Sequence, residues 1–510
     1  MTVVLGGEPL RESDLVAVAR AGADVLLSAP AQQRLAQARG HVDEMAASDR
    51  AVYGISTGFG ALASRHIPTE LRTQLQRSLV RSHAASSGDE VEAEVVRGLM
   101  LLRLQTMATG RTGVRPQTAA AYAALLNAGI TPVVREYGSL GCSGDLAPLA
   151  HAALAVMGEG EVRMAGRLMP AAAALAAIGL QPVVLAEKEG LALINGTDGM
   201  LAMLMLACAD LDLLCRTADL SAAMSLEALL GTDRVLAADL MALRPQHGQG
   251  IAASNMRRLL EGSTIVASHR GPDDTRVQDA YSVRCAPQVA GGLRDTVAHA
   301  RIIAARESAS AVDNPVLLED GRLESNGNFH GAPLAYVLDF LAIPTADVAS
   351  MSERRTDRML DPHRSHGLPA FLAGDPGVDS GLMIAQYMQA AVVSELKRLA
   401  VPASVDSIPS SAMQEDHVSM GWGAARKLRR SVDGLARVLA VEIMTAARAL
   451  NLRAPLTPAP ATAAAVGVLR ERVDGPGTDR FLSPEIEATV ELVRSGALIA
   501  AAESVTGGLE

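Results

Sequence analysis

A serine between small residues is the first candidate for chemistry in this chain of 510 residues. Segment 141–148 reads Gly-Cys-Ser-Gly-Asp-Leu-Ala-Pro and leads into an apolar stretch. One interpretation is a helix start, with Asp145 as the cap and Pro148 tolerated in the early turn. The Gly-x-Ser-x-Gly elbow of serine hydrolases is not matched.

A second interpretation uses the glycine that follows the serine. Because Gly144 has no Cβ, its backbone nitrogen could approach and attack the carbonyl carbon of Cys142. Loss of water from the new ring and from Ser143 would leave an electrophilic methylidene-imidazolone built from the chain itself. From these residues alone, both interpretations stay open.

The composition limits the partners that can be expected. Hydrophobic residues make up 49% of the chain and charged residues 20%, as in soluble globular proteins. The net charge of -10 gives no basic surface for nucleic acid or an anionic membrane, so neither partner is expected. Four cysteines without a Cys-x-x-Cys pair, and an N-terminus unlike a signal peptide, favour the cytoplasm.

Helices should position these residues, because helix-favouring residues dominate and alternating strand patterns are scarce. Apolar residues from Leu428 to Leu450 recur in steps of three and four, which predicts a long bundle helix over 418–450. Further helices are predicted at 70–107, 117–126, 200–229, 293–312, 332–351 and 380–399. We expect three parts: 1–200 with the active-site loops, a central bundle over 201–455 and a helical portion over 456–510.

Seven motifs occur in the order expected for one enzyme family. They occupy 53–60, 82–85, 141–151, 188–197, 278–284, 326–331 and 414–417. With these motifs the chain resembles the histidine and aromatic amino acid ammonia-lyase family over nearly its whole length. Within the family, it is most similar to the bacterial histidine-specific members of actinobacterial type.

The resemblance implies a mainly α fold, a long-helix bundle of the aspartase and fumarase class with a smaller N-terminal globular portion that carries the active-site loops. It also implies a homotetramer whose active sites draw on more than one subunit. The expected activity is elimination of ammonia from L-histidine to give trans-urocanate, the first step of histidine degradation. The prosthetic group would be the methylidene-imidazolone from Cys142, Ser143 and Gly144, with no external cofactor and no metal.

Two residues depart from the family pattern. Cys142 stands where Ala is commoner, but the position gives the ring only its carbonyl and Cα, so the side chain is expected to be a spectator. Ser56 replaces the commoner Asn near Tyr53, which could alter hydrogen bonds in that loop without removing the phenol.

The resemblance also implies roles for individual residues. Tyr53 and Tyr281 would be acid/base groups, and Arg284 would clamp the substrate carboxylate with paired hydrogen bonds. Asp145 would assist ring formation besides capping a helix. The remaining expected contacts with the ring or the amino acid are Asn195, Gln278 and Phe329. Which of Tyr53, Tyr281 or Glu415 takes the β-proton stays open.

Substrate choice depends mainly on two positions. His83 matches the imidazole-contacting histidine of histidine lyases, although a tyrosine lyase can also carry His there. Glu415 discriminates better, because its carboxylate can accept a hydrogen bond from an imidazole N–H but would be left unpaired by an apolar ring. Tyrosine or phenylalanine lyase or aminomutase activity is the alternative within the family.

Other classes of protein fit less well. The glycine-rich segment 58–63 loosely fits a dinucleotide motif but lacks a preceding strand. His363 and His366 lack a metal-ligand partner at suitable spacing, and Lys188, the best Schiff-base candidate for pyridoxal phosphate, has no phosphate-binding glycine loop nearby. A fumarase-like loop at 410–413 is only partly matched, and a non-enzymatic helical scaffold would leave Ser143 unmodified.

Overall fold

The computed structural model describes residues 1–48, 52–58, 62, 64–271, 274 and 277–510. Its contacts divide the chain into two compact units. The first consists of Met1–Ala207, Ala300–Asp339 and Pro402–Arg426, and the second of Cys208–His299, Phe340–Val401 and Lys427–Glu510. The three-part division expected above stays a prediction. Phe59, Gly60 and most of the glycine-rich segment 58–63 lie outside the described residues.

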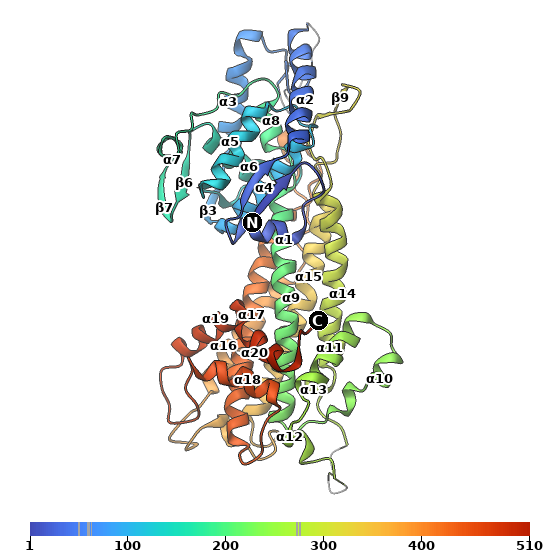
Figure 1. The fold of residues 1–510 in the computed structure, drawn as a ribbon, viewed down its shortest axis with the longest axis vertical. Coiled ribbons are helices and arrows are strands. Elements are labelled where there is room, and N and C mark those ends of the chain that lie inside the picture. The colour runs from blue at the N-terminus through green and yellow to red at the C-terminus, as the bar shows by residue number, and fades with distance from the viewer. Residues whose placement is uncertain (49–51, 59–61, 63, 272–273, 275–276) are drawn as a thin grey trace. The chain divides into compact units, whose positions relative to one another are not determined.

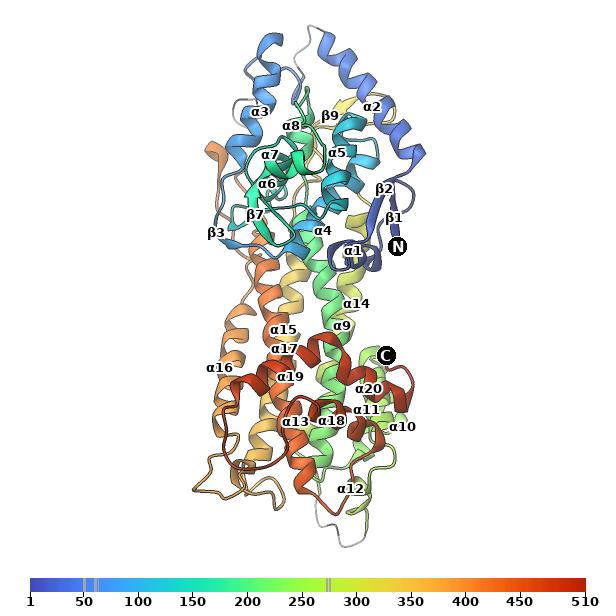
Figure 2. The same ribbon diagram turned by 60° about the vertical axis from the view of Figure 1, so that its left-hand side comes forward.

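The first unit is a cluster of helices with small sheets (Figure 1). Helices α3, α6 and α8 pack against one another, and α4 packs on α5 (Figure 2). The helices that lie wholly in this unit are α1 (Glu12–Ala19), α2 (Ala29–Ala47), α3 (Arg72–His83), α4 (Ala93–Ala108), α5 (Pro116–Asn127), α6 (Leu146–Val156), α7 (Ala171–Ala177) and α8 (Glu189–Ile194), with the 3-10 turns η2 (Thr69–Leu71) and η5 (Ser411–Met413).

Short strands connect distant parts of the first unit. The strands are β1 (Thr2–Leu5), β2 (Asp24–Leu27), β3 (Ser87–Glu90), β4 (Thr131–Pro132), β5 (Arg135–Tyr137), β6 (Glu161–Met164), β7 (Arg167–Pro170), β8 (Val316–Leu317) and β9 (Leu323–Glu324). β1 pairs in parallel with β2, with Thr2 opposite Asp24. The other pairings, β3 with β5, β4 with β6 and β7, and β8 with β9, are antiparallel.

The longest helices have residues in both units. They are α9 (Asp198–Ala228), α14 (Ala286–Ser308), α15 (Ala332–Leu360) and α17 (Gly421–Leu452). The remaining elements of the second unit are η3 (Asp233–Leu236), α10 (Ala238–Ala242), α11 (His247–Leu259), α12 (Thr264–Ala267), α13 (Tyr281–Arg284), η4 (Ala370–Leu372), α16 (Met383–Leu399), α18 (Pro460–Arg470), α19 (Ser483–Ser495) and α20 (Ala497–Thr506).

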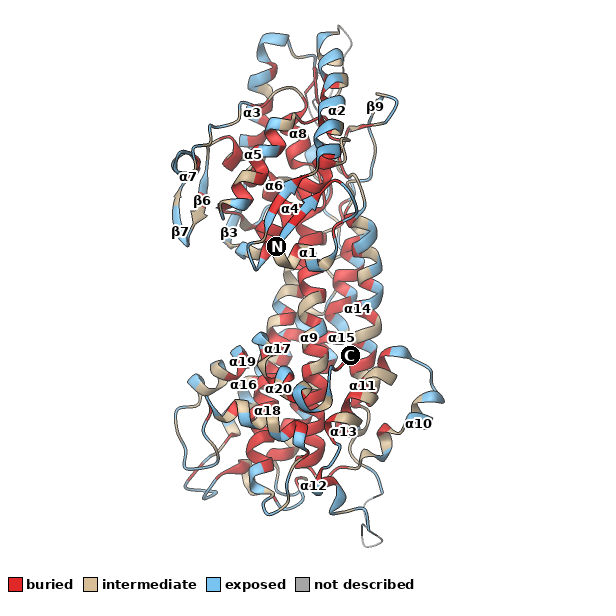
Figure 3. Ribbon diagram, viewed as in Figure 1, coloured by how far each residue is buried: buried red, intermediate tan, exposed pale blue. Residues whose placement is uncertain are grey.

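The apolar stripe predicted along α17 is buried. Its members Leu428, Leu435, Leu439 and Ile443 have no exposed surface, and buried residues also follow α9 and α15 in the second unit (Figure 3). Steps of three and four residues keep these side chains on one face, so the helix is stabilised by its neighbours rather than by propensity alone. The predicted long helix is confirmed, with its start at Gly421.

Buried polar groups in the second unit are paired across the bundle. Arg355 of α15 donates to Glu442 of α17 at 2.8 Å, and Ser225 of α9 donates to the same carboxylate at 2.6 Å. Removing one partner of such a pair would leave an uncompensated buried charge and would destabilise the bundle.

Helix α15 is long and apolar enough to cross a membrane by composition, but 61% of its apolar window is buried inside the protein. A helix in the core of a bundle passes the same test, because its apolar residues face neighbouring helices instead of lipid.

Several predicted helices have different bounds in the structure, such as the helix predicted over 332–351, which continues to Leu360 as α15. The helix predicted over 70–107 is interrupted, since α3 ends at His83 and β3 precedes α4. At Gly88, in the interruption, φ is +91° and an added Cβ would lie 2.8 Å from the Tyr137 ring, so the chain turns there to pair with β5. The helix predicted over 293–312 is α14, which begins earlier and ends at Ser308.

Candidate active site

The loop that carries Ser143 is held tightly by neighbouring backbone. Gly144 has a φ of +70°, and a Cβ added to it would lie 2.0 Å from the carbonyl oxygen of Gly196. The amide of Asp145 donates to that same oxygen at 2.7 Å. On the other side, the carbonyl of Gly141 accepts from the Gly331 amide at 3.0 Å and from the Ser419 hydroxyl at 2.8 Å. Only glycine fits at position 144, which agrees with a tripeptide whose backbone must close on itself.

The carboxylate of Asp145 does not cap its own helix. Asp145 precedes α6 at the N-cap position without a side-chain cap bond. Instead, it accepts from the amides of Gly199 and Met200 in the first turn of α9, both at 2.9 Å, and from the Ser139 hydroxyl at 2.9 Å. The prediction that Asp145 caps the helix that follows it is wrong, because the amides that its carboxylate accepts from belong to α9, which begins at Asp198. Asp145 thereby connects the loop of Ser143 to the start of α9.

Burial raises the pKa of Asp145 to about 7, against an ordinary value of 3.8, although the donated hydrogen bonds act in the opposite direction. Between about pH 4 and pH 7 the folded chain still binds the Asp145 proton, whereas the unfolded chain has lost it. Protonation of Asp145 therefore stabilises the folded state fully below about pH 4, and this stabilisation is lost as the pH rises towards 7. Asp145→Asn cannot titrate. We expect its unfolding free energy relative to the parent protein to rise by up to about 4 kcal/mol over this range. Urea unfolding of both proteins at several pH values measures this difference; a pH-independent difference would contradict it.

Glu415 lies beside the tripeptide. Its Oε2 accepts from the Ser410 hydroxyl at 2.8 Å and from the Cys142 thiol at 3.3 Å, and its Oε1 lies 3.4 Å from the Ser143 hydroxyl. The backbones of Ser410 and Glu415 also bond in both directions. The Cys142 thiol therefore has a partner in the folded chain, and the expectation that its side chain is a spectator in ring formation stays a prediction.

His83 ends α3 in the same region. Its Nδ1 lies 2.9 Å from the carbonyl oxygen of Leu79, a contact that leaves Nε2 for a ligand. Burial lowers the pKa of His83, while the charge of Glu415 acts to raise it. A neutral imidazole with Nδ1 as the donor presents an acceptor at Nε2.

The side-chain amide of Asn195 is a further polar group that could contact a ligand. It follows α8, and its side-chain nitrogen donates to the carbonyl of Asn314 at 2.9 Å. Its side-chain oxygen is buried and has no hydrogen-bond partner among the described residues. A buried acceptor without a partner is costly, which favours a ligand donor at this position. The carbonyl of Asn195 is held by fully buried Arg103 at 2.6 Å.

The loop that contains Phe329 meets the loop that contains Glu415. Phe329 is half-buried. Its neighbour His330 stacks on His417, with ring centroids 5.2 Å apart and ring nitrogens 3.2 Å apart. Two motifs that are distant in sequence are therefore adjacent in the first unit.

Lys188 contacts the loop that carries Tyr53. Its Nζ donates to Asp313 at 2.6 Å, and both side chains are fully buried. Its backbone amide donates to the carbonyl of Gly54 at 3.1 Å. Since Asn314 follows Asp313 and accepts from Asn195, one ion pair connects three loops of the site.

Removal of one member of this pair should be strongly destabilising. We expect Lys188→Met to lower the free energy of unfolding by about 3–5 kcal/mol, because Asp313 is then left buried without its partner. The double variant Lys188→Met/Asp313→Leu removes both charges and should recover much of the loss. Urea unfolding tests this, and equal destabilisation by the single and double variants would count against it.

Tyr53 is half-buried in a turn whose hydrogen bonds include Ser56. The Ser56 hydroxyl accepts from the amide of Val52 at 2.9 Å, and the Ser56 amide donates to the carbonyl of Val52 at 2.9 Å. Serine at this position therefore closes the turn that carries the phenol.

Gln278, Tyr281 and Arg284 belong to the second unit, so the predicted site residues are divided between the units. The Arg284 guanidinium lies over the Tyr281 ring, 4.6 Å from its centroid, and the Nε of Arg284 is buried without a hydrogen-bond partner among the described residues. Gln278 is exposed, and Tyr281 is 70% exposed. A guanidinium stacked on a phenol with a free donor suits a carboxylate ligand.

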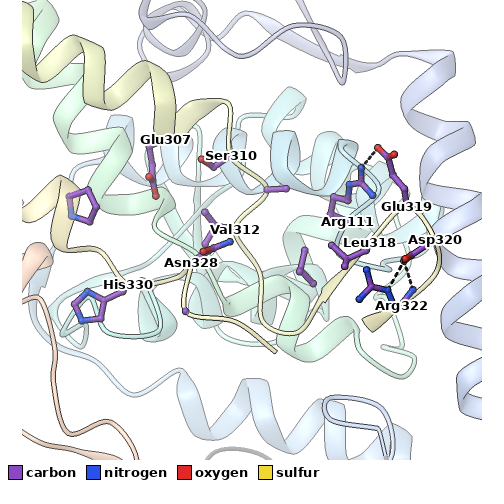
Figure 4. A pocket seen from close by; sticks show the side chains of 14 residues that line it. Arg111, Glu307, Ser310, Val312, Leu318, Glu319, Asp320, Arg322, Asn328 and His330 are labelled. Carbon is purple, nitrogen blue, oxygen red and sulfur yellow. Dashed lines mark hydrogen bonds and ion pairs between the residues drawn. The ribbon is translucent and has the colours of Figure 1, made fainter. Parts of the chain in front are cut away.

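A cavity of about 1040 Å³ lies next to the Phe329 loop in the first unit (Figure 4). Glu307, Asn328 and His330 line it, together with the paired groups Arg111 and Glu319. It does not include Ser143, His83 or Glu415. In the described part of the chain, no group of three or more His, Cys, Asp or Glu side chains is arranged to hold a metal ion.

The match to a family model defines the class of protein. The model for the aromatic amino acid lyases matches residues 10–471. The chain therefore belongs to the aromatic amino acid lyase family, as its motifs indicated.

Comparison with individual proteins shows which members of the family are similar to this chain. Proteins named histidine ammonia-lyase from Streptomyces avermitilis and Streptomyces griseus are 64% and 66% identical, over 100% of this chain and 99% of each relative. Among solved structures, tyrosine aminomutase from Streptomyces globisporus matches with a TM-score of 0.94 and 36% identity over 100% of both chains. Histidine ammonia-lyase from Trypanosoma cruzi matches with a TM-score of 0.91 and 37% identity over 99% of this chain and 96% of that one. The predicted mainly α fold of this lyase class is confirmed.

Proposed function

We propose that the protein is a carbon-nitrogen lyase that eliminates ammonia from L-histidine to give trans-urocanate. The observation that carries the proposal is that Glu415 lies beside Ser143 and is near enough to His83 for its charge to act on the imidazole, since both side chains can hydrogen-bond an imidazole ligand. The high identity to relatives named histidine ammonia-lyase supports the same substrate.

The proposed prosthetic group is a methylidene-imidazolone formed by Cys142, Ser143 and Gly144 without an external cofactor. When formed, it supplies an electrophile that captures the amine and makes ammonia a better leaving group. Two observations support ring formation by these three residues: no side chain can be accommodated at Gly144, and the carbonyl of the preceding Gly141 is held by hydrogen bonds. Asp145 would assist ring formation, because its raised pKa lets it hold a proton near neutral pH.

The other residues would bind the amino acid and move its protons. Arg284 would bind the carboxylate, and Asn195 would accept from the amino group. Tyr53, Tyr281 and Glu415 are the groups available for removal of the β-proton. Gln278 and Phe329 would complete the wall of the site, with Phe329 as its apolar part.

The proposal extends to a cytoplasmic homotetramer whose active sites draw on more than one subunit. This part rests on the family resemblance. The position of Gln278, Tyr281 and Arg284 in a different unit from Ser143 is compatible with it.

A second candidate is tyrosine lyase or aminomutase activity, which the similarity to tyrosine aminomutase favours. The purified protein should be incubated separately with L-histidine and L-tyrosine, without any cofactor. Urocanate and ammonia from histidine would support the proposal. Coumarate or β-tyrosine from tyrosine, without urocanate from histidine, would replace it by the second candidate.

Replacement of His83 by leucine tests the substrate assignment within the site. The variant loses an imidazole contact but gains apolar surface for a phenyl ring, so kcat/KM for histidine relative to phenylalanine should fall by about tenfold or more. The two rates are compared by absorbance of urocanate and cinnamate. An unchanged ratio would remove His83 from substrate recognition.

A further inference from the structure

The two carboxylate oxygens of Glu415 have different partners. Oε2 accepts from Ser410 at 2.8 Å and from Cys142 at 3.3 Å. Oε1 has the Ser143 hydroxyl at 3.4 Å. Ring formation would leave the two donors to Oε2 in place but would remove the Ser143 hydroxyl, the donor to Oε1.

The donors on Oε2 are fixed in place. Ser410 is bonded through its backbone to Glu415 in both directions, at 2.9 and 3.3 Å. Cys142 is only 7% exposed, and burial, followed by the charge of Glu415, raises the pKa of its thiol to about 12. The thiol therefore stays protonated at neutral pH and can donate to the carboxylate.

The donor on Oε1 is removed when the ring forms. Ring closure joins the nitrogen of Gly144 to the carbonyl carbon of Cys142, and that carbonyl oxygen leaves as water with the amide protons of Ser143 and Gly144. The hydroxyl of Ser143 then leaves as a second water with the Cα proton of the same residue. The Cys142 thiol takes no part in either loss and remains.

We infer that Cys142 and Ser410 are positioning residues that hold Oε2 of Glu415, so that the loss of the Ser143 hydroxyl leaves Oε1 as the acceptor for an imidazole N–H. The site would then acquire its specificity for imidazole in the same step that creates its electrophile. The inference rests on the proposed function, because it takes imidazole as the ring that is bound. A phenyl ring has no N–H and would leave the carboxylate unpaired.

Binding of two product-like acids to the matured protein tests this. Urocanate and cinnamate share the acrylate and differ in the ring, so a change confined to urocanate reports the contact with imidazole. We expect Cys142→Ala and Ser410→Ala each to weaken urocanate binding about fivefold by calorimetry, with cinnamate changed less than twofold. Cys142→Ser and Ser410→Thr keep a donor and should retain most of the urocanate affinity.

Matched controls and peptide masses complete the experiment. Cys215→Ala replaces a cysteine of the second unit, and Ser411→Ala replaces the serine next to Ser410, so both should leave the two affinities unchanged. The Cys142→Ala peptide should still show the loss of two waters. If it does not, the Ser410→Ala variant still tests the inference, because Ser410 is not one of the residues that form the ring. An equal weakening of both acids, or no weakening of urocanate, would overturn the inference while urocanate production by the parent protein continued. Absence of urocanate production by the parent protein would overturn the proposed function as well.

Discussion

Replacement of Ser143 by alanine should reduce histidine turnover by about a thousandfold or more, a loss comparable to removal of a covalent catalytic residue in other enzymes. Without the hydroxyl there is no second water to lose, so the methylidene carbon cannot form. The amine would then leave without an electrophile, and the remaining contacts would only bind the substrate. Ammonia release and the mass of the 142–144 peptide are the two measurements.

The matched control is Cys142→Ala, which keeps the carbonyl and Cα that the ring requires. Its peptide should show the loss of two waters, whereas the Ser143→Ala peptide should not. Histidine turnover by Ser143→Ala close to that of the parent protein would refute the electrophile assigned to residues 142–144.

The second large effect is expected for Glu415→Gln. The amide keeps the size of the side chain but loses its charge, so the hydrogen bond to an imidazole N–H weakens and one of the three candidate bases is removed. We expect kcat/KM for histidine to fall about a hundredfold. Urocanate affinity should fall as well, while cinnamate affinity should be retained or improved.

Glu319→Gln is the control for this change, because Glu319 is an exposed acid beside Arg111 and contacts none of the predicted site residues among its described partners. It should leave turnover unchanged. A Glu415→Gln protein with normal discrimination between urocanate and cinnamate would show that Glu415 does not recognise the ring.

The long helices could be predicted because their signal is local. The stripe from Leu428 to Leu450 needs only the spacing of apolar residues in one segment. The interruption after His83 was missed because α3 and α4 both consist mainly of helix-favouring residues, and the strand between them is fixed by β5, more than forty residues away. Gly88 in that interruption was the available local signal.

The site could be predicted to the extent that motifs identify residue types. Ser143, His83, Asn195 and Glu415 lie in separate motifs, and all four belong to the first unit. The proximity of Glu415 to Ser143 joins positions 272 residues apart, so no spacing rule in the sequence could indicate it. It depends on how the chain folds back after α15.

The supporting groups could not be predicted. Ser139, Ser410 and Asp313 are ordinary polar residues in the sequence, and their roles arise from partners that only the fold supplies. The partners of Asp145 could not be predicted either, because its position before α6 indicated a cap on that helix, whereas its carboxylate accepts from the distant amides of Gly199 and Met200. The Cys142 thiol acquires a partner only when the 410–415 turn lies against it.

Competition among substrates is the decisive test of the proposed preference for histidine. Equal concentrations of L-histidine, L-tyrosine and L-phenylalanine in one reaction report the ratio of their kcat/KM values, which is the measure of specificity. We expect urocanate to be the main product from the start of the reaction. A predominance of coumarate, β-tyrosine or cinnamate would contradict the assignment of His83 and Glu415 as the groups that recognise imidazole.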